Sequence, residues 1–216
     1  LLRLRDAADV HAEADVFAGT VRPRFEVSPP AYVLRAVRRG PAFAWVERAA
    51  DGPIDPTEAV GPSFAVRAAR FAAGLRFDET LGPDGTSDYA MGSETELLAR
   101  LGRAGARAWY ARDAVVEHVV TASQVETDAL VGRAYRYGRG RWRLGTSRLA
   151  AARLRVRGLP LAVLGDLLVR RLAYARARRR SDAEATLRAA WRIAYLAGHL
   201  AESRRARGLA PGLGAA

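Results

Sequence analysis

The run Gly92-Ser93-Glu94-Thr95-Glu96-Leu97-Leu98-Ala99-Arg100-Leu101 places two carboxylates at the start of a helix. The spacing of its leucines predicts one apolar helical face over residues 93–104. An acidic, turn-rich loop precedes it and begins with Phe77-Asp78-Glu79-Thr80-Leu81-Gly82. Backbone N–H groups and the helix dipole stabilise a carboxylate at such a helix start. Glu94 is therefore in a position that suits a general base.

Local spacing also allows a purely structural role for these acids. Ser93-x-x-Glu96 is a capping box, which predicts that Glu96 reaches back to the backbone N–H of Ser93. Glu94 is then the first helical residue, and spacing alone favours a surface acid that stabilises the helix dipole. The acids of the preceding loop are predicted to be solvated turn residues: Asp78, Glu79, Asp84 and Asp88.

Length and composition limit the classes of protein to consider. The 216 residues suffice for one good core, or for one domain with a helical appendage. The absence of cysteine excludes a disulfide framework and a thiolate metal site. A net charge of +12 suits a polyanionic partner, but all 35 basic residues are arginine, which genome composition bias explains equally well. The best membrane-span candidate, 159–169, is too short, because a span needs about 20 apolar residues.

The order of predicted elements divides the chain near residue 122. A helix within 3–13, a strand over 14–21, a strand end at 64–66 and a helix over 67–73 come first. Strands over 106–110 and 114–120 follow the central helix, with a turn at Arg112-Asp113 between them. Helices then follow over 125–137, beyond the stretch Gly138-Arg139-Gly140-Arg141, and from Ser181, where Glu184 completes a capping box. The prediction is an α/β part over 1–122 and a helical extension over 123–216.

His118 lies on the last predicted strand and shares a face with Ala114 and Val116. A hydrogen-bonded core histidine is the commoner explanation of such a position. Alternatively, His118 lines one pocket with Glu94, where a neutral imidazole suits a divalent metal.

A basic, aromatic helix is predicted after residue 125. Its arginines interleave with aromatic residues: Arg133, Arg136, Arg139, Arg141 and Arg143 with Tyr135, Tyr137 and Trp142. Such a helix grips phosphates, lies on lipid headgroups or presents a solvated face, and spacing does not choose among these.

Taken together, these segments resemble the C-terminal half of a family 2 glycosyltransferase with a GT-A (nucleotide-diphospho-sugar transferase-like) fold. The Phe77–Gly82 run matches that family's "FDE-x-LG" element, and Gly92–Leu97 falls where "G-E-D-x-E-L" is common. Three further segments match in order: 14–25 after the metal-binding strand, 61–67 with Ser63 replacing the usual Asn, and 113–118 ending in the family's histidine. The resemblance spans about residues 14–145. It implies a partial GT-A fold with a C-terminal helical extension.

Two departures from the family pattern affect the interpretation. The family's Glu-Asp pair appears as Ser93-Glu94, so a carboxylate one methylene longer than Asp occupies the catalytic-base position. The donor-binding strands and the Asp-x-Asp metal motif have no counterpart, since Asp6 and Asp9 have the wrong spacing. The chain is therefore expected to be a fragment that begins just after that motif and is inactive alone.

The resemblance implies an inverting transfer of a sugar from a nucleotide-sugar donor to an acceptor hydroxyl. Glu94 would be the base, and His118 would contact the metal or the diphosphate. Ser63, Gly92 and Ser93 would border the sugar and acceptor pocket, and Arg139 would approach the diphosphate or a lipid-linked acceptor. A divalent metal, Mg²⁺ or Mn²⁺, would be held mainly by the missing half. The helical extension would suit docking at the cytoplasmic, anionic face of a membrane.

Two other classes of function remain open on the sequence. The charge and the Arg/Tyr/Trp helix also suit a non-enzymatic protein that binds nucleic acid. The acidic motif around Glu94 counts against this class, because it would sit awkwardly on a phosphate-binding face. A degenerate transferase that serves as a scaffold is the other alternative.

Overall fold

A computed structural model describes residues 2–145, 154–156 and 159–206 of the chain. Its contacts divide the chain into two compact units, and each is described by itself. The first unit comprises Leu1–Ser28, Arg39–Glu79 and Ser93–Ala122. The second comprises Pro29–Arg38, Thr80–Gly92 and Ser123–Ala216.

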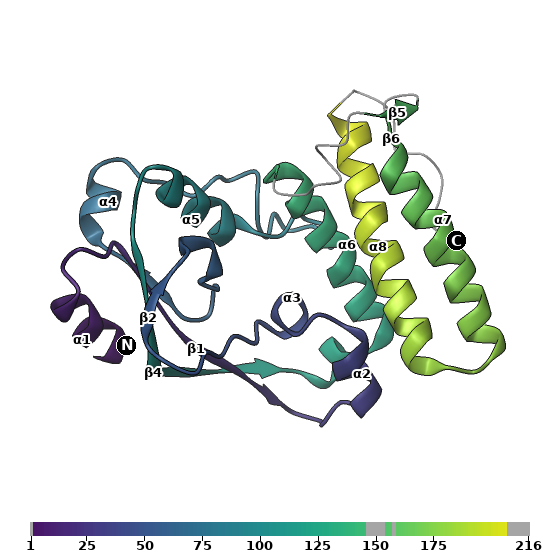
Figure 1. The fold of residues 1–216 in the computed structure, drawn as a ribbon, viewed down its shortest axis with the longest axis horizontal. Coiled ribbons are helices and arrows are strands. Elements are labelled where there is room, and N and C mark those ends of the chain that lie inside the picture. Colours follow the sequence, from purple (N-terminus) through teal and green to yellow (C-terminus); the bar gives the residue numbers. More distant parts are fainter. Residues whose placement is uncertain (1, 146–153, 157–158, 207–216) are drawn as a thin grey trace. The chain divides into compact units, whose positions relative to one another are not determined.

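The first unit is built on a mixed four-stranded sheet (Figure 1). Its strands are β1 (Val16–Phe25), β2 (Gly52–Ile54), β3 (Phe64–Val66) and β4 (Ala108–Val120), in the order β2-β4-β1-β3. The long central strands β1 and β4 are parallel, whereas each short edge strand is antiparallel to its neighbour. The predicted α/β architecture is thereby confirmed, and the GT-A assignment stays a prediction.

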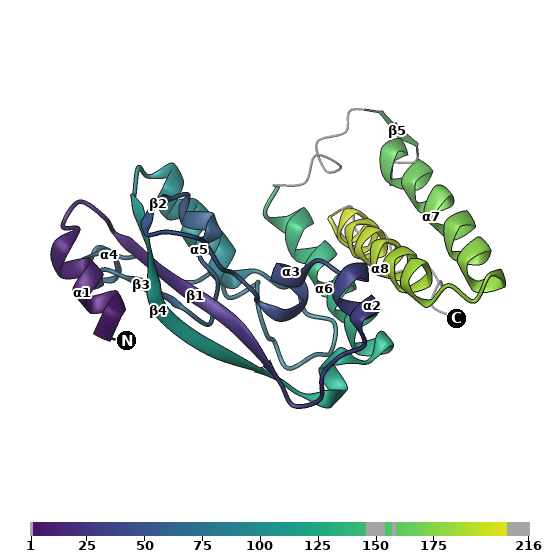
Figure 2. The same ribbon diagram turned by 60° about the horizontal axis from the view of Figure 1, so that its bottom comes forward.

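Helices cover both faces of this sheet, as Figure 2 shows for α1 (Leu2–Val10) and α5 (Ser93–Arg103). Successive side chains of β1 point to opposite faces. Val16 and Ala18 share a core cluster with Leu98 and Leu101 of α5, whereas Phe17 packs with residues of α1 on the other face. Three shorter helices complete the unit: α3 (Arg39–Phe43), η1 (Pro56–Glu58) and α4 (Ala68–Ala72).

The prediction of two strands separated by a turn at Arg112-Asp113 was wrong, because β4 is continuous from Ala108 to Val120. The turn residues lie instead at an irregularity of the pairing. Between paired positions the partner residue on β4 advances from Ala111 to Val116, while β1 advances only from Gly19 to Val21. The hydroxyl of Thr20 donates to the carbonyl oxygen of Arg112 at 2.7 Å. This bond holds the extra β4 residues against β1.

The second unit is mainly helical. Its helices are α2 (Ala31–Ala36), α6 (Thr127–Arg143), α7 (Leu161–Arg179) and α8 (Ala183–Arg205), and α8 packs against the other three. A short pair of strands, β5 (Arg155–Val156) and β6 (Leu159–Pro160), precedes α7, and the turn η2 (Ala122–Val125) leads into α6. Within the described residues, no helix has a stretch long and apolar enough to cross a membrane.

The Gly-Arg stretch 138–141 does not end a helix as predicted, since α6 continues through it to Arg143. Its glycines permit close packing. A Cβ on Gly138 would lie 2.1 Å from the carbonyl oxygen of Tyr195 on α8, and a Cβ on Gly198 would lie 2.2 Å from that of Tyr135 on α6. The two helices therefore cross nearly backbone to backbone.

The start of α8 also differs from the prediction. Asp182, rather than Ser181, caps the helix by accepting a hydrogen bond from the backbone N–H of Ala185 at 2.9 Å. Ser181 has a φ of 53°, a left-handed conformation outside the helix. Glu184 does not cap the helix and instead forms ion pairs with Arg35 and Arg188.

Candidate functional site

Glu94 occupies the first turn of α5 in the first unit, as predicted. The helix begins directly after Gly92, whose φ of 115° is rarely adopted by residues with a side chain. The hydroxyl of Ser93 donates to Oε2 of Glu94 at 3.2 Å, and both residues are half-buried. One carboxylate oxygen is thus oriented by its neighbour.

The other oxygen of Glu94 faces the loop before β3. A Cβ on Gly61 would lie only 3.2 Å from Oε1 of Glu94, which is tighter than ordinary van der Waals contact. Because residue 61 is a glycine, the Glu94 carboxylate can lie close to the backbone of this loop. The segments 61–67 and 92–97, about 30 residues apart, come together at this point.

Ser63 lies two residues beyond Gly61 but is packed into the sheet. Its carbonyl oxygen accepts from the backbone N–H of Gly19 at 3.1 Å, and its hydroxyl is buried without a hydrogen-bond partner among the described residues. It borders a cavity of about 290 Å³ whose other walls come from Leu2–Leu4 and Asp113–Val116. Ser63 therefore follows the loop that contacts Glu94, but its own side chain packs against β1 and β4.

Glu96 does not form the predicted capping box. Both of its carboxylate oxygens accept from Nε of Arg100, at 2.8 and 2.9 Å, one helical turn further on. Arg100 in turn donates to the carbonyl oxygen of Arg76 and so connects α5 to the start of the acidic run. This partly buried i,i+4 pair satisfies the carboxylate of Glu96, which therefore does not reach back to Ser93.

Of the acids of the preceding loop, Asp84 is exposed in a local turn, as predicted, whereas Asp88 is half-buried and ion-paired. Asp84 accepts hydrogen bonds from the backbone N–H of Thr86 at 2.9 Å and from its hydroxyl. These bonds, the side-chain bond first, hold the pKa of Asp84 below its ordinary value. Asp88 pairs with Arg139 at 3.1 Å and with Arg205 at 3.6 Å. The loop is built around turn geometry and ion pairs.

Arg139 lies in the interior of the second unit. Its guanidinium is only 4% exposed and donates from Nε to Glu202 of α8 at 2.6 Å. Arg143 and Arg205 contact the same carboxylate, at 2.9 and 3.2 Å. This cluster of Arg139, Arg143, Arg205, Asp88 and Glu202 joins α6, α8 and the 80–92 loop. Its geometry gives Arg139 a structural role, and the predicted contact to substrate has no support from it.

His118 lies on β4 opposite Pro23 of β1 and is half-buried. Mg²⁺ and Mn²⁺ prefer several oxygen ligands, so one imidazole is a poor site for either. Across residues 2–145, 154–156 and 159–206, no three His, Asp or Glu side chains are grouped so that they could hold a metal ion. The described residues alone therefore do not fit a divalent cation.

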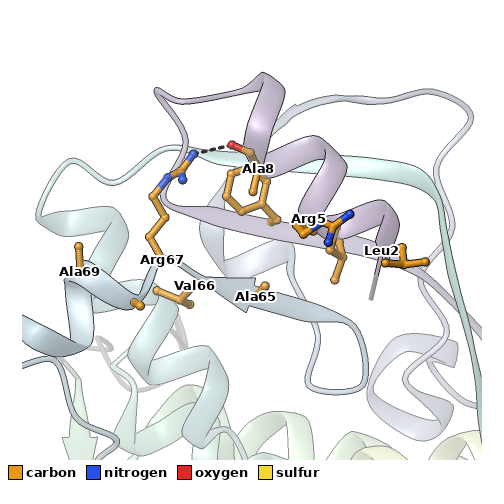
Figure 3. Close-up of a pocket in the computed structure, with 10 residues that line it drawn as sticks. Leu2, Arg5, Ala8, Ala65, Val66, Arg67 and Ala69 are labelled. Carbon is orange, nitrogen blue, oxygen red and sulfur yellow. Dashed lines mark hydrogen bonds between the residues drawn. The ribbon is translucent and has the colours of Figure 1, made fainter.

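An apolar cavity of about 530 Å³ lies between α1 and the β3–α4 segment. Figure 3 shows Arg67 at one end of it, reaching toward Ala8 of α1, with Ala65 and Val66 along its wall. Arg67 donates to the carbonyl oxygens of Ala14, Ala8 and His11 at 2.7, 2.8 and 3.0 Å. Arg67, which the sequence placed only in a motif, therefore adds hydrogen bonds from the end of β3 to α1 and to the segment after it.

The sequence also gave no sign of an arginine-lined pocket in the second unit, because its residues come from four separate elements. Of the interleaved arginine and aromatic residues between positions 133 and 143, only Tyr137 borders this pocket. Of the predicted site residues, the structure groups Glu94 and Ser93 with the loop that carries Ser63, whereas Arg139 belongs to the ion-pair cluster of the second unit.

No family model matches the chain, and neither a curated protein nor a solved structure matches it significantly.

Proposed function

We propose that the chain forms the acceptor side of an inverting glycosyltransferase with a GT-A fold, with Glu94 as the general base. The observation that carries this proposal is the position of the Glu94 carboxylate, at a helix start and against Gly61. Two segments that carry the family resemblance, 61–67 and 92–97, meet there, and each contributes what a base site needs. One supplies a carboxylate, and the other supplies a loop without a side chain at the point of approach.

The proposed step is a single displacement. Glu94 takes the proton of an acceptor hydroxyl as that oxygen forms a bond to the anomeric carbon of the donor sugar. The bond from the anomeric carbon to the nucleoside diphosphate breaks, and the diphosphate leaves with the electron pair. Ser93 orients one carboxylate oxygen through its hydrogen bond, so the other oxygen is the one that receives the proton.

The described residues do not fit a metal, so no part of this step is assigned to one. If a divalent ion assists the departing diphosphate, other residues hold it. The proposed acceptor is a saccharide or a lipid-linked acceptor, and the proposed location is peripheral, on the inner face of the cell membrane. The net charge of +12 supports that location, since an anionic surface attracts arginine side chains.

The test uses the natural protein that contains this chain, with UDP-, GDP- and dTDP-linked sugars as probes. Release of nucleoside diphosphate is measured with and without saccharide acceptors. Glu94→Gln should lower the rate at least about a hundredfold, because a general base contributes about 10²–10⁴-fold.

Glu96→Gln is the matched control, because this neighbouring carboxylate is bound to Arg100 rather than available for proton transfer. Its rate should stay within about twofold of the unmodified protein, because the substitution is nearly isosteric and the Glu96 carboxylate does not face the reacting atoms in the proposed step. Near-normal turnover by Glu94→Gln, with its circular dichroism unchanged, would remove Glu94 from the base position.

A further inference from the structure

The second unit contains a pocket of about 350 Å³ that is unusually rich in arginine. Helix α2 and the residues after it form one wall, and α6, α7 and α8 supply the rest. Figure 1 shows α2 beside α8. The five arginines at its wall come from regions of sequence far apart: Arg35, Arg38, Arg170, Arg188 and Arg192. Among the described residues, no carboxylate lines it. Genome composition bias explains many arginines, but not their convergence on one cavity.

Two carboxylates behind the wall hold four of these arginines in place. Glu184 accepts from Nε of Arg35 at 2.7 Å and from Arg188. Asp166 accepts from Nε of Arg170 at 3.0 Å and from Nε and Nη2 of Arg192 at 3.0 and 2.6 Å. Five guanidiniums therefore share two negative charges, and a charge of about +3 remains at the pocket.

These ion pairs leave hydrogen-bond donors for a ligand. Each guanidinium carries five N–H donors in a planar fork. Arg35 and Arg170 each form their ion pair through Nε, so neither uses its terminal nitrogens in a hydrogen bond to a described residue. The pKa of Glu184 is lowered, first by its bond to Arg35. Burial raises the pKa of Asp166, but the bonds from Arg192 and Arg170 outweigh it and keep this carboxyl ionised.

Arg38 differs from the other four arginines. It follows α2, is exposed, and forms no ion pair or hydrogen bond with any residue that the structure describes. Since no described residue pairs with this cation, its guanidinium is available to an anion in the pocket. The wall also contains Tyr137, Trp191 and Tyr195, and the guanidinium of Arg192 lies 5.1 Å from the ring centre of Tyr195. Stacking of this kind fixes the orientation of the fork.

From this geometry we infer that the pocket binds a phosphate-bearing ligand, through the free edges of Arg35, Arg38 and Arg170. Arginine forks match phosphate oxygens in pairs, which is why they dominate phosphate recognition. The volume, about 350 Å³, is at the small end of ligand sites and suits one or two phosphate groups with a small headgroup. The site is independent of Glu94, because it rests on residues of the second unit alone.

Calorimetric titration of the protein with inorganic pyrophosphate tests the inference. Saturable binding is expected, and it should weaken as salt rises because salt screens the charges. Arg38→Ala and Arg170→Ala should each raise the dissociation constant about tenfold, the usual effect of losing one charged hydrogen bond. Arg171→Ala is the matched control. This substitution removes the same charge from the same helix as Arg170→Ala, but Arg171 is exposed and does not line the pocket. The dissociation constant of the Arg171→Ala variant for pyrophosphate should therefore stay within about twofold of that of the unmodified protein.

Vesicles distinguish the source of the phosphate group. If it belongs to a lipid headgroup, phosphatidylcholine vesicles with phosphatidic acid should bind the protein, pure phosphatidylcholine vesicles should not, and pyrophosphate should compete. If it belongs to a soluble compound, pyrophosphate should bind while both kinds of vesicle fail. Either result supports the pocket. It is overturned if neither probe binds, or if Arg38→Ala and Arg170→Ala bind as Arg171→Ala does. Because Arg38 pairs with none of the described residues, its variant also remains informative if Arg170→Ala unfolds.

Discussion

At the scale of single residues, two carboxylates two positions apart have different environments. Glu96 is paired with Arg100 on the helix surface, whereas Glu94 lies between the Ser93 hydroxyl and Gly61. The sequence predicted that both would be at a helix start. It could not predict which way each side chain turns, because an i,i+4 pair and a capping box compete for the same acid. The surroundings of Glu94 could not be predicted either, because Gly61 lies some 30 residues earlier in the chain.

The burial of Arg139 also could not be predicted from the sequence, because a Gly-Arg stretch is typical of an exposed segment unless a distant acid pairs with its arginine. Glu202, 63 residues later, is the partner, and both side chains are almost completely buried. Glu202→Gln should destabilise the protein by about 3 kcal/mol, because breaking a buried ion pair leaves a charge uncompensated. Asp88 still contacts Arg139 and keeps the loss at the low end of the usual range. Urea unfolding measures this loss.

The matched control for that substitution is Glu96→Gln, which breaks a partly exposed i,i+4 pair of the same chemical type. Its loss should be only about 0.3–0.5 kcal/mol. Equal losses in the two variants would show that burial does not make the Arg139–Glu202 pair more important for stability than the Glu96–Arg100 pair.

At the scale of elements, helix packing explains the glycines of α6. A Cβ on Gly140 would lie 1.6 Å from the carbonyl oxygen of Met91, which is backbone and cannot move aside cheaply. Gly140→Ala should therefore cost about 1–3 kcal/mol in the free energy of unfolding, the usual cost of overpacking. Gly132→Ala is the control, because a Cβ there would meet only the end of the flexible Arg136 side chain, at 3.5 Å.

Gly132→Ala should stabilise the protein by about 0.5–1 kcal/mol through helix propensity alone. Opposite signs for the two substitutions in one helix are the expected pattern in denaturant unfolding. A stabilising Gly140→Ala would contradict the close approach of the 80–92 loop to α6.

Local patterns predicted elements well where one helix face is buried. The predicted helix over 93–104 is confirmed as Ser93–Arg103, and Leu97, Leu98 and Leu101 are all buried. Patterns failed where tertiary contacts override local signals. Arg112-Asp113 looks like a turn, yet pairing with β1 keeps β4 continuous through it. The glycines of α6 look like a helix end, yet they serve a helix crossing.

At the scale of the whole molecule, one buried histidine makes stability depend on pH. His199 of α8 is fully buried, and burial lowers its pKa to about 4. Its Nε2 has no hydrogen-bond partner among the residues described. The unfolded chain, with a pKa near 6.5, takes up the proton first on acidification. The stability contributed by neutral His199 is therefore full above pH 6.5 and falls as the pH decreases toward 4.

The expected loss is about 3 kcal/mol between these limits, from the difference between the two pKa values. Unfolding experiments from pH 7 to pH 5 measure its first part, and His199→Leu should flatten the curve there. The pKa values of the paired carboxyls Asp15, Asp166 and Glu184 are also lowered. Their contribution has the same sign but falls mainly below pH 5. A slope that persists unchanged in His199→Leu would assign it to other groups.

The most direct test of the central claim compares Glu94→Gln, Glu94→Asp and Glu96→Gln in one sugar-transfer assay under single-turnover conditions. If Glu94 is the base, Glu94→Gln should be slower by about 10²–10⁴-fold, because it cannot accept the proton. Glu94→Asp should retain clearly more activity than Glu94→Gln, since it keeps a carboxylate, and Glu96→Gln should transfer at the unmodified rate. Equal rates for Glu94→Gln and Glu96→Gln would contradict the assignment of the base and, with it, the proposed function of this site.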